Sequence, residues 1–226
     1  MRATIRRLIE TLDRAYPFPG PICEFGAYQV AGQEERAVRP LFQERAYIGT
    51  DIRIGPGVDL VIDLHQVGLR DSSIGTAILL DTVEHVRYFW RASEEIYRIL
   101  RPGGIAVFTS VMYFPIHAYP SDYWRFTPEG FRVLVEPFEQ TLIESAGLSG
   151  FPHSVVAIGV KGPLEEASPD ALSAALLDWK RHSSQTWKEI AANLLPPAFL
   201  IPLYNAFTRL ASRKPGPAAP KRTKEK

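Results

Sequence analysis

The sequence predicts an α/β fold with a mostly parallel, doubly wound sheet. Short β-branched runs bounded by Gly, Pro and Asp indicate buried strands, and amphipathic stretches between them indicate helices. Strands that alternate with helices imply a parallel sheet covered on both faces. Four of the runs share one pattern: apolar residues, then an acidic residue, then a turn. The four acidic positions are Glu24, Asp51, Asp63 and Asp81.

The first half of the chain opens with apolar residues at helical spacing, which predict a helix over residues 4–15. Three prolines between residues 17 and 21 end it. The remaining elements predicted for this half are a strand near Ile22, a crossover helix over 33–42, and strands over 47–51, 58–63 and 75–81.

The second half continues the alternation. A helix is predicted over 89–100, ended by Arg101-Pro102-Gly103-Gly104, and a strand over 105–109. A loop rich in proline and aromatic residues follows over 112–127. Pro128 then occupies the first position of a helix, where its missing N–H is tolerated. The last strand is predicted over 155–160, with Leu142–Ile143 in its hairpin partner.

Composition divides the chain into four predicted segments: an N-terminal helix and linker (1–20), the α/β domain (21–162), a helical extension (163–212) and a disordered basic tail (213–226). The extension contains helix candidates over 170–195 and 199–210. The tail is rich in Pro, Lys and Ala and has no large apolar side chain, which is typical of disorder.

Overall composition is that of a globular protein, with 226 residues, 46% hydrophobic and 23% charged. The single cysteine, Cys23, excludes an internal disulfide and indicates a reducing compartment. The N-terminus lacks the pattern of a secretion signal, and there is no apolar stretch long enough to span a membrane. We therefore expect a cytoplasmic protein.

The net charge of +1 hides an asymmetry. Residues 171–226 carry ten Lys and Arg against three Asp and Glu. This surplus allows peripheral membrane contact through 196–226, where an apolar stretch precedes the basic tail. The alternatives are that the apolar stretch packs on the body and that the tail only aids solubility. No aromatic residues interleave with the basic ones in 211–226, so no nucleic-acid partner is expected.

The acidic residues at the strand ends indicate a ligand site. In open α/β sheets, ligands bind beyond the carboxyl ends of the strands. Carboxylates there can accept hydrogen bonds from ribose hydroxyls, an exocyclic amine or an ammonium group, which favours a nucleoside-bearing cofactor. Each carboxylate could instead serve only as a helix N-cap.

One segment resembles a known family. Asp81-Thr82-Val83-Glu84-His85-Val86, followed by a helix and then Ile99-Leu100-Arg101-Pro102-Gly103-Gly104, is similar to class I S-adenosylmethionine-dependent methyltransferases, specifically the type 11 group. The resemblance covers residues 20–161. It implies a Rossmann-like, seven-stranded sheet, S-adenosylmethionine as cofactor, and methyl transfer as the activity.

The resemblance also implies roles for seven residues. They are Glu24 and Gly26 beneath the methionine part, Asp51 on both ribose hydroxyls, Asp63 with Leu64 beside the adenine, and Asp81 with Thr82 on the floor near the sulfonium. The chain departs from the family's acidic-x-Gly-x-Gly pattern because Tyr28 replaces the second glycine. A side chain there could clash with the methionine tail or stack on it.

A hydroxyl or protonated amine acceptor needs a base, and the candidates are His117, Asp122 and His85, in that order. His85 could instead pack or contact the cofactor. Loop residues 113–126 follow the fifth strand, so they should fold over the cofactor's methyl group. They could carry the acceptor-binding groups or only exclude water. No His/Cys/Asp cluster has ligand spacing along the chain, so no metal site is predicted.

The sequence therefore predicts an S-adenosylmethionine-dependent methyltransferase that methylates an oxygen or nitrogen of a small molecule or glycan. The alternative is a non-catalytic S-adenosylmethionine-binding or structural domain with a degenerate glycine loop. The acceptor and the oligomeric state are left open.

Overall fold

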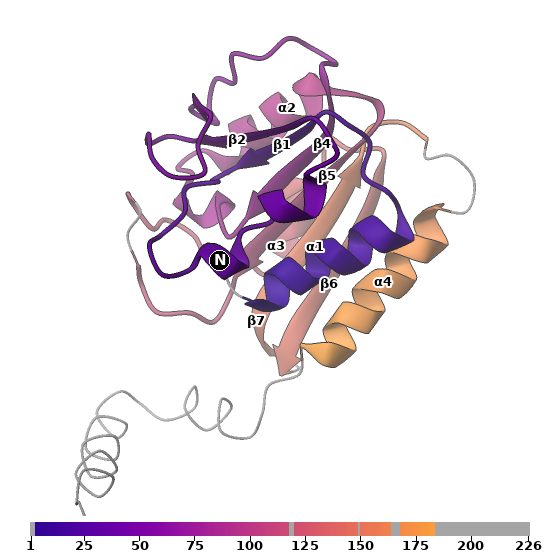
Figure 1. Ribbon diagram of the computed structural model, residues 1–226. Coiled ribbons are helices and arrows are strands. Elements are labelled where there is room, and N and C mark those ends of the chain that lie inside the picture. The colour runs from indigo at the N-terminus through magenta and orange to yellow at the C-terminus, as the bar shows by residue number, and fades with distance from the viewer. Residues whose placement is uncertain (1–2, 118–119, 149, 164–167, 184–226) are drawn as a thin grey trace, which may run out of the picture. The chain divides into compact units, whose positions relative to one another are not determined.

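A seven-stranded sheet forms the centre of the computed structural model, which describes residues 3–117, 120–148, 150–163 and 168–183. The strand order is β3-β2-β1-β4-β5-β7-β6 (Figure 1). The strands are β1 (Ile22–Phe25), β2 (Tyr47–Asp51), β3 (Leu60–Val61), β4 (Ile74–Leu80), β5 (Leu100–Val111), β6 (Gln140–Leu148) and β7 (Phe151–Val160). Only β7 runs antiparallel to its neighbours, so the predicted mostly parallel, Rossmann-like sheet is confirmed.

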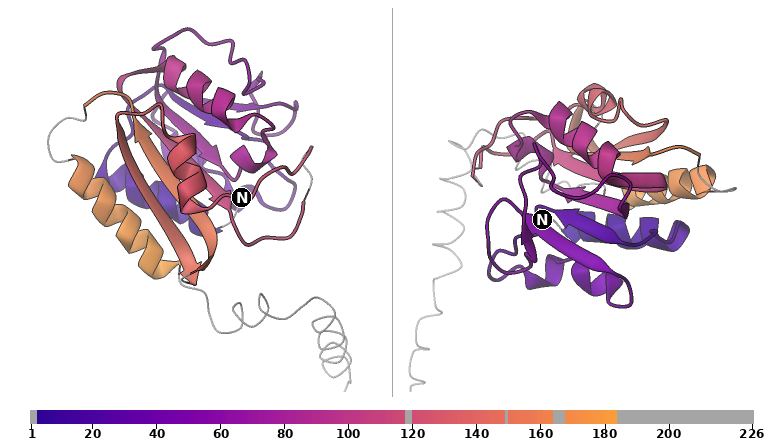
Figure 2. Two further views of the ribbon diagram at one scale, coloured as in Figure 1. Left: turned by 180° about the vertical axis from the view of Figure 1, so that it is seen from behind. Right: turned by 90° about the horizontal axis from the view of Figure 1, so that it is seen from above.

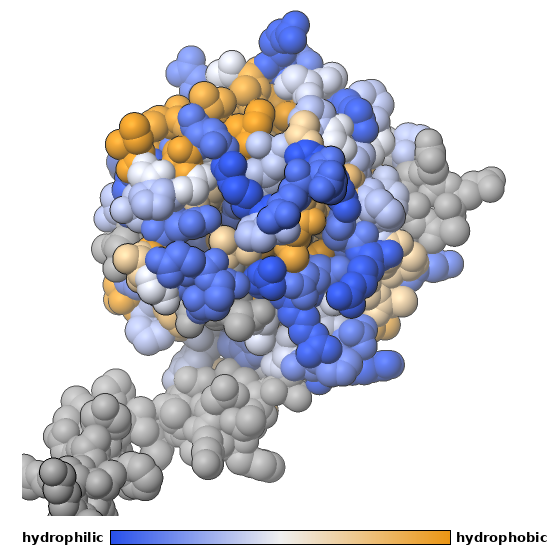
Figure 3. Space-filling model, viewed as in Figure 1, coloured by the Kyte–Doolittle hydropathy of each residue, from blue (hydrophilic) through white to orange (hydrophobic). Residues whose placement is uncertain are grey.

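Helices cover both faces of this sheet, as predicted (Figure 2). Helices α1 (Ala3–Ala15) and α4 (Ser168–His182) lie on one face, and α2 (Phe89–Ile99) and α3 (Pro128–Leu134) lie on the other. The outward side of α1 is largely hydrophilic (Figure 3). Its inward side is apolar and buried, in agreement with the amphipathic pattern that predicts this helix.

The strands divide their side chains between two cores. In β4, Ala77 and Leu79 face α2 and α3, whereas Ile78 and Leu80 face α1 and α4. This follows from the two-residue period of a strand, and burial on both faces explains why every residue of β4 is buried and most are apolar. The sheet is therefore fixed by packing from both sides, and its strand ends offer rigid positions for a site.

Helix α4 is the described part of the predicted extension, and it packs beside α1. Trp179 is fully buried, and its indole Nε1 donates to the Thr4 carbonyl at 3.0 Å. Both predicted flanking segments thus contribute to the core beneath the sheet. The helix candidate over 199–210, the basic tail and the predicted membrane contact through 196–226 lie outside the described residues. Among the described residues, no helix is long and apolar enough to cross a membrane.

Two elements differ from the sequence prediction. Residues 33–42 form two short 3-10 turns, Glu34–Arg36 and Arg39–Phe42, and not an α-helix. Pro40 lacks an N–H and its ring would clash with the preceding turn, so a continuous helix is excluded there. The run over 58–63 yields only the two-residue β3, and both its side chains are exposed because it is the edge strand.

Candidate cofactor and acceptor site

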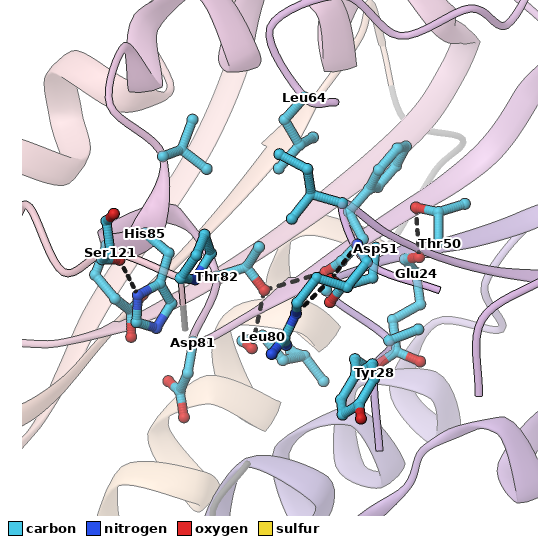
Figure 4. Close-up of a pocket in the computed structure, with 18 of the residues that line it drawn as sticks. Glu24, Tyr28, Thr50, Asp51, Leu64, Leu80, Asp81, Thr82, His85 and Ser121 are labelled. Atoms are coloured by element: carbon cyan, nitrogen blue, oxygen red, sulfur yellow. Dashed lines mark hydrogen bonds and ion pairs between the residues drawn. The ribbon is translucent and has the colours of Figure 1, made fainter. Parts of the chain in front are cut away.

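A cleft of about 560 Å³ opens at the carboxyl ends of the central strands (Figure 4). Every residue predicted to bind the cofactor lines it, and so do two of the three predicted catalytic residues. The lining residues from the prediction are Glu24, Gly26, Asp51, Asp63, Leu64, Asp81, Thr82, His85 and His117. The third predicted catalytic residue, Asp122, does not line it. The strand-end reasoning thus correctly grouped residues that are up to 58 positions apart in the chain, from Glu24 to Thr82.

The turn after β1 is held by its backbone. Gly26 has φ +84°, a conformation that side chains other than glycine rarely adopt. A Cβ at this position would lie 2.3 Å from Thr82 Oγ1. The Gly26 N–H donates to the Thr50 carbonyl at 2.8 Å, which ties the turn to the end of β2. This close approach explains why Thr82 and a glycine occur together at the floor of the cleft.

Tyr28, where the chain departs from the family's glycine pattern, packs against the loop that follows β2. Its ring lies 4.3 Å from the Arg53 guanidinium carbon, which stacks over it. Gly55 provides the space, since a Cβ there would lie 2.3 Å from the ring's Cε2. The tyrosine lines the cleft as one wall, and its ring is held by its own partners.

Two carboxylates sit at the ends of β2 and β3. Asp51 is 9% exposed, and its Oδ1 accepts from the Arg53 N–H at 2.9 Å and from Arg53 Nε at 3.2 Å. The Asp63 side chain is 53% exposed and pairs with His65 Nδ1 at 2.6 Å. Burial alone would raise the pKa of Asp63, but the contacts from His65 outweigh it and the pKa lies below its usual value. Asp51 is the more enclosed of the two.

Glu24 lies in β1, and its pKa is raised. Burial raises its pKa to about 7, although the Tyr47 hydroxyl, which donates to Glu24 Oε2, and the positive charge of Arg39 both oppose the shift. A cation bound beside Glu24 would favour its ionised form. Glu24 is therefore suited to respond to an ammonium group at this end of the cleft.

Asp81 follows β4 in a left-handed conformation, with φ +49°. Its N–H donates to the Thr109 carbonyl at 3.1 Å, and the Thr109 hydroxyl donates to Asp81 Oδ1 at 3.1 Å. These contacts attach the end of β4 to the end of β5. Asp81 is consequently fixed at the floor of the cleft, where the resemblance placed it.

Two histidines come together at the opposite end of the cleft. The rings of His85 and His117 lie edge to face, with centroids 4.8 Å apart. His85 Nδ1 lies 2.6 Å from the Ser121 carbonyl oxygen, which can only accept, so Nδ1 carries the proton and Nε2 keeps its lone pair. Burial lowers the pKa of His85, which keeps this ring neutral at neutral pH.

Asp122 holds the loop. Its side chain is 3% exposed and accepts from both terminal nitrogens of Arg125, at 2.6 and 2.7 Å. It also accepts from the His117 N–H at 2.8 Å. The Arg125 guanidinium, more than any other neighbour, holds the pKa of Asp122 well below its usual range. Such a carboxylate is a weak base, and its contacts suit it to positioning His117.

The sequence prediction missed Glu84, which is fully buried and also lines the cleft. The Ser110 hydroxyl donates to Glu84 Oε2 at 2.9 Å, and the Glu84 carbonyl accepts from the Tyr123 N–H at 2.8 Å. Glu84, His85 and His117 each offer a possible metal-ligand atom, all within 4.8 Å of one another. The spacing of these three residues along the chain could not reveal the group, because His117 lies on a long loop that folds back toward Glu84 and His85.

The predicted lid contains two kinds of aromatic residue. Trp124 and Phe126 pack with Phe89, with ring centroids 5.4 and 5.2 Å from it. Four large hydrophobic side chains among the described residues of the loop are exposed, and Ile116 is 90% exposed. These exposed residues are Tyr113, Phe114, Ile116 and Tyr123. Part of the loop is therefore core, and part forms an apolar rim near the two histidines.

Known proteins share parts of this sequence and this fold. The sequence profile of a methyltransferase-domain family matches residues 38–108. This match confirms the predicted resemblance to class I S-adenosylmethionine-dependent methyltransferases over that part of the chain. S-adenosylmethionine is the cofactor that the match supports. The residues fit that molecule, since Gly26 lets the turn after β1 lie close against Thr82 in the cleft wall and the strand ends supply carboxylate acceptors.

Solved structures share the fold at low sequence identity. A possible histamine N-methyltransferase from Thermotoga maritima is 20% identical, with 70% of this chain and 89% of that chain covered and a TM-score of 0.52. The 1,6-didemethyltoxoflavin-N1-methyltransferase from Burkholderia thailandensis, solved with S-adenosylhomocysteine, is 16% identical (71% and 79% covered; TM-score 0.53). The [4+2]-cyclase SpnF is 15% identical (70% and 81% covered; TM-score 0.50). No curated protein matches the sequence significantly. These similarities concern the fold, which hosts more than one chemistry.

Proposed function

We propose that this protein transfers the methyl group of S-adenosylmethionine to a hydroxyl or amine of a small molecule or glycan. The observation that carries the proposal is the arrangement of the cleft. One end has the glycine turn and the strand-end carboxylates, and the other has His85 and His117 beneath an apolar rim. A cofactor site and an acceptor site thus share one cavity.

The cofactor's sulfonium supplies an already activated methyl group, so the main task of the protein is alignment. In well-oriented systems such positioning contributes roughly 7–11 kcal/mol. Asp51, which is nearly buried and fixed by Arg53, is suited to accept the two ribose hydroxyls. Glu24 and the Gly26 turn are suited to the ammonium and methionine part, and Leu64 offers an apolar contact for the adenine.

The acceptor end supplies a base. His85 holds its proton on Nδ1, so Nε2 can take a proton from an acceptor hydroxyl or ammonium. His117 Nδ1 faces the Pro115 carbonyl at 3.2 Å and Asp122 Oδ2 at 3.3 Å, both acceptors, so its Nε2 also keeps a lone pair. Either ring meets the chemical requirement, and the low pKa of Asp122 argues against a direct role for that carboxylate.

The rim supports a small molecule or a glycan as acceptor. Exposed aromatic and aliphatic side chains beside a few polar groups are the usual lining of a small-molecule site. Tyr113 and Phe151 pack edge to face, with centroids 6.4 Å apart, which extends this apolar surface beyond the loop. A ring with apolar faces and polar edges would match such a surface.

Calorimetry with S-adenosylmethionine and S-adenosylhomocysteine tests the cofactor half of this function. We expect Asp51→Ala to weaken binding at least about tenfold, since removing a charged hydrogen-bond acceptor costs about 1.5–3 kcal/mol. The matched control is Asp71→Asn, an exposed aspartate paired with Arg98, which should bind normally. Normal binding by Asp51→Ala would show that the ribose lies elsewhere.

Transfer itself is tested with isotopically labelled methyl groups and panels of hydroxylated compounds, amines and oligosaccharides. Labelled product that depends on His85 or His117 supports the proposed function. Tight cofactor binding without labelled product from any panel would favour the non-catalytic domain. Failure to bind the cofactor at all would reject both the enzyme and the cofactor-binding domain, and would leave a structural domain.

A further inference from the structure

We propose that Glu84, His85 and His117 form a binding site for a divalent transition-metal cation at the acceptor end of the cleft. Each residue offers one ligand atom, and the three atoms lie within 4.8 Å of one another. Two ligand atoms on one tetrahedral ion are about 3.4 Å apart, given metal–nitrogen and metal–oxygen bonds near 2.1 Å. Rotation of the side chains would close the remaining difference.

Both imidazoles have the outer contacts that metal-binding histidines use. Ligating histidines almost always donate their second ring N–H to a carbonyl or carboxylate, which fixes the ring and its tautomer. His85 meets the Ser121 carbonyl in this way at 2.6 Å. His117 faces Asp122 Oδ2 at 3.3 Å and the Pro115 carbonyl at 3.2 Å. Both Nε2 atoms are therefore available as ligands.

The carboxylate is also pre-oriented. Glu84 is fully buried in the 3-10 turn Val83–His85 that follows β4, and the Ser110 hydroxyl donates to its Oε2 at 2.9 Å. Arg125, whose positive charge acts on Glu84, forms a bidentate pair with Asp122. Burying a carboxylate charge costs free energy unless a cation compensates it. A divalent ion between Glu84 and the two rings would provide that charge.

The donor set selects the kind of ion. Imidazole nitrogens suit zinc, cobalt and similar ions, whereas magnesium and calcium prefer all-oxygen sites. Two histidines with one carboxylate are three protein ligands, which is the number found in catalytic rather than structural zinc sites, because a position stays open. Here the remaining position would face the cleft, since all three residues line it.

The role of the ion rests on the proposed function. An acceptor hydroxyl oxygen bound at the open position would have its pKa lowered by the cation. The proton leaves to water. An oxygen lone pair then forms the O–CH3 bond while the S–CH3 bond breaks, and sulfur keeps that electron pair as a neutral thioether. In this arrangement the ion, and not a free imidazole, activates the acceptor.

The site is tested on the full chain after a chelator has removed any bound metal. Metal salts are then added in the absence of cofactor and substrate. We expect calorimetry with zinc chloride to show one ion per chain, and cobalt chloride to give the visible absorption of a nitrogen- and oxygen-ligated ion. His117→Ala and His85→Ala should each weaken binding by at least about tenfold. His182→Ala is the matched control, because His182 is exposed on α4 beside Asp178, and it should bind as wild type does.

Stoichiometric binding that survives both His85→Ala and His117→Ala would overturn the proposal, as would the absence of binding at millimolar zinc and cobalt. Glu84→Gln should also weaken binding. If that buried substitution unfolds the protein, His117→Ala on the exposed loop decides. The metal-free chain should still bind S-adenosylmethionine. Loss of cofactor binding in every form would reject the proposed function, whereas metal binding unaffected by the histidines would reject only the metal site.

Discussion

The two ends of the cleft are built in different ways. At the cofactor end, Gly26, Asp51 and Asp81 lie at or directly after strand ends, and backbone hydrogen bonds between strands fix them. At the acceptor end, His117 belongs to a loop that is held internally by the ion pair of Asp122 with Arg125. The Tyr123 and Trp124 N–H groups attach this loop to the Glu84 carbonyl.

This difference separates what the fold supplies from what this chain adds. Sheet geometry fixes strand ends rigidly, so a cofactor site there follows from the fold itself. Loops on a rigid scaffold vary, and they carry the residues that choose the acceptor. We therefore expect substitutions at the cofactor end to affect cofactor binding, and those in the loop to leave it nearly unchanged.

The largest effect is expected for Gly26→Ala. The left-handed φ of +84° costs a non-glycine residue about 1–2 kcal/mol. The added Cβ would also overlap Thr82 Oγ1, and forced packing typically costs about 1–3 kcal/mol more. Cofactor affinity, measured by calorimetry, should fall about a hundredfold or more, because the turn must move.

Gly32→Ala is the matched control. Gly32 also has a left-handed φ, +78°, but a Cβ added there would have no atom within 4 Å beyond its chain neighbours. This variant should show only the backbone strain, as a modest loss in thermal stability, with cofactor affinity intact. Equal loss of affinity in both variants would mean that backbone strain, and not the close approach to Thr82, governs the cofactor end.

The next effect tests the loop. Asp122→Asn removes the charge from a bidentate ion pair whose carboxylate is buried, which should lower the free energy of unfolding by about 1.5–3 kcal/mol in urea titrations. Cofactor affinity should change little. Glu129→Gln is the control, because Glu129 and Arg132 have the same sequence spacing but are exposed, and such pairs contribute about 0–1 kcal/mol.

The pH dependence of the Asp122 effect has a definite sign. The pKa of Asp122 is lower in the folded protein than in the unfolded chain, where it is near 3.8. Its contribution to stability is therefore fully present above that value and is lost as the pH falls below it. The wild type and Asp122→Asn should converge in stability in acid. A difference that persists unchanged at low pH would show that the pair contributes by packing and not by charge.

The same contrast explains how much could be predicted from sequence. Strand ends are local features, marked by β-branched runs and acidic or glycine turns, so Gly26, Asp51 and Thr82 could be assigned to the cleft. The meeting of His117 with Glu84 depends on the path of a long loop, for which no short-range pattern exists. The prediction of a helix over 33–42 was wrong for a local reason, since Pro40 is incompatible with a continuous helix there.

The smallest expected effect concerns Glu24 and the pH dependence of cofactor binding. The pKa of Glu24 is about 7 in the free protein, above its ordinary value of 4.5, because of burial. The ammonium group of a bound cofactor would favour the ionised carboxylate and lower that pKa. Binding then releases a proton below pH 7, so affinity should rise with pH by up to about tenfold between pH 6 and 8 and level off above.

Glu24→Gln separates the contribution of this carboxylate from those of the other ionisable groups of the cleft. Its affinity should be lower and nearly independent of pH over the same range. Tyr47→Phe sharpens the test, because the Tyr47 hydroxyl donates to Glu24 and stabilises its ionised form. Loss of that donor should move the midpoint of the affinity curve to higher pH. If Glu24→Gln keeps the wild-type dependence of affinity on pH, the ammonium group lies elsewhere. Asp51 and the glycine turn alone would then account for the affinity of the cofactor end.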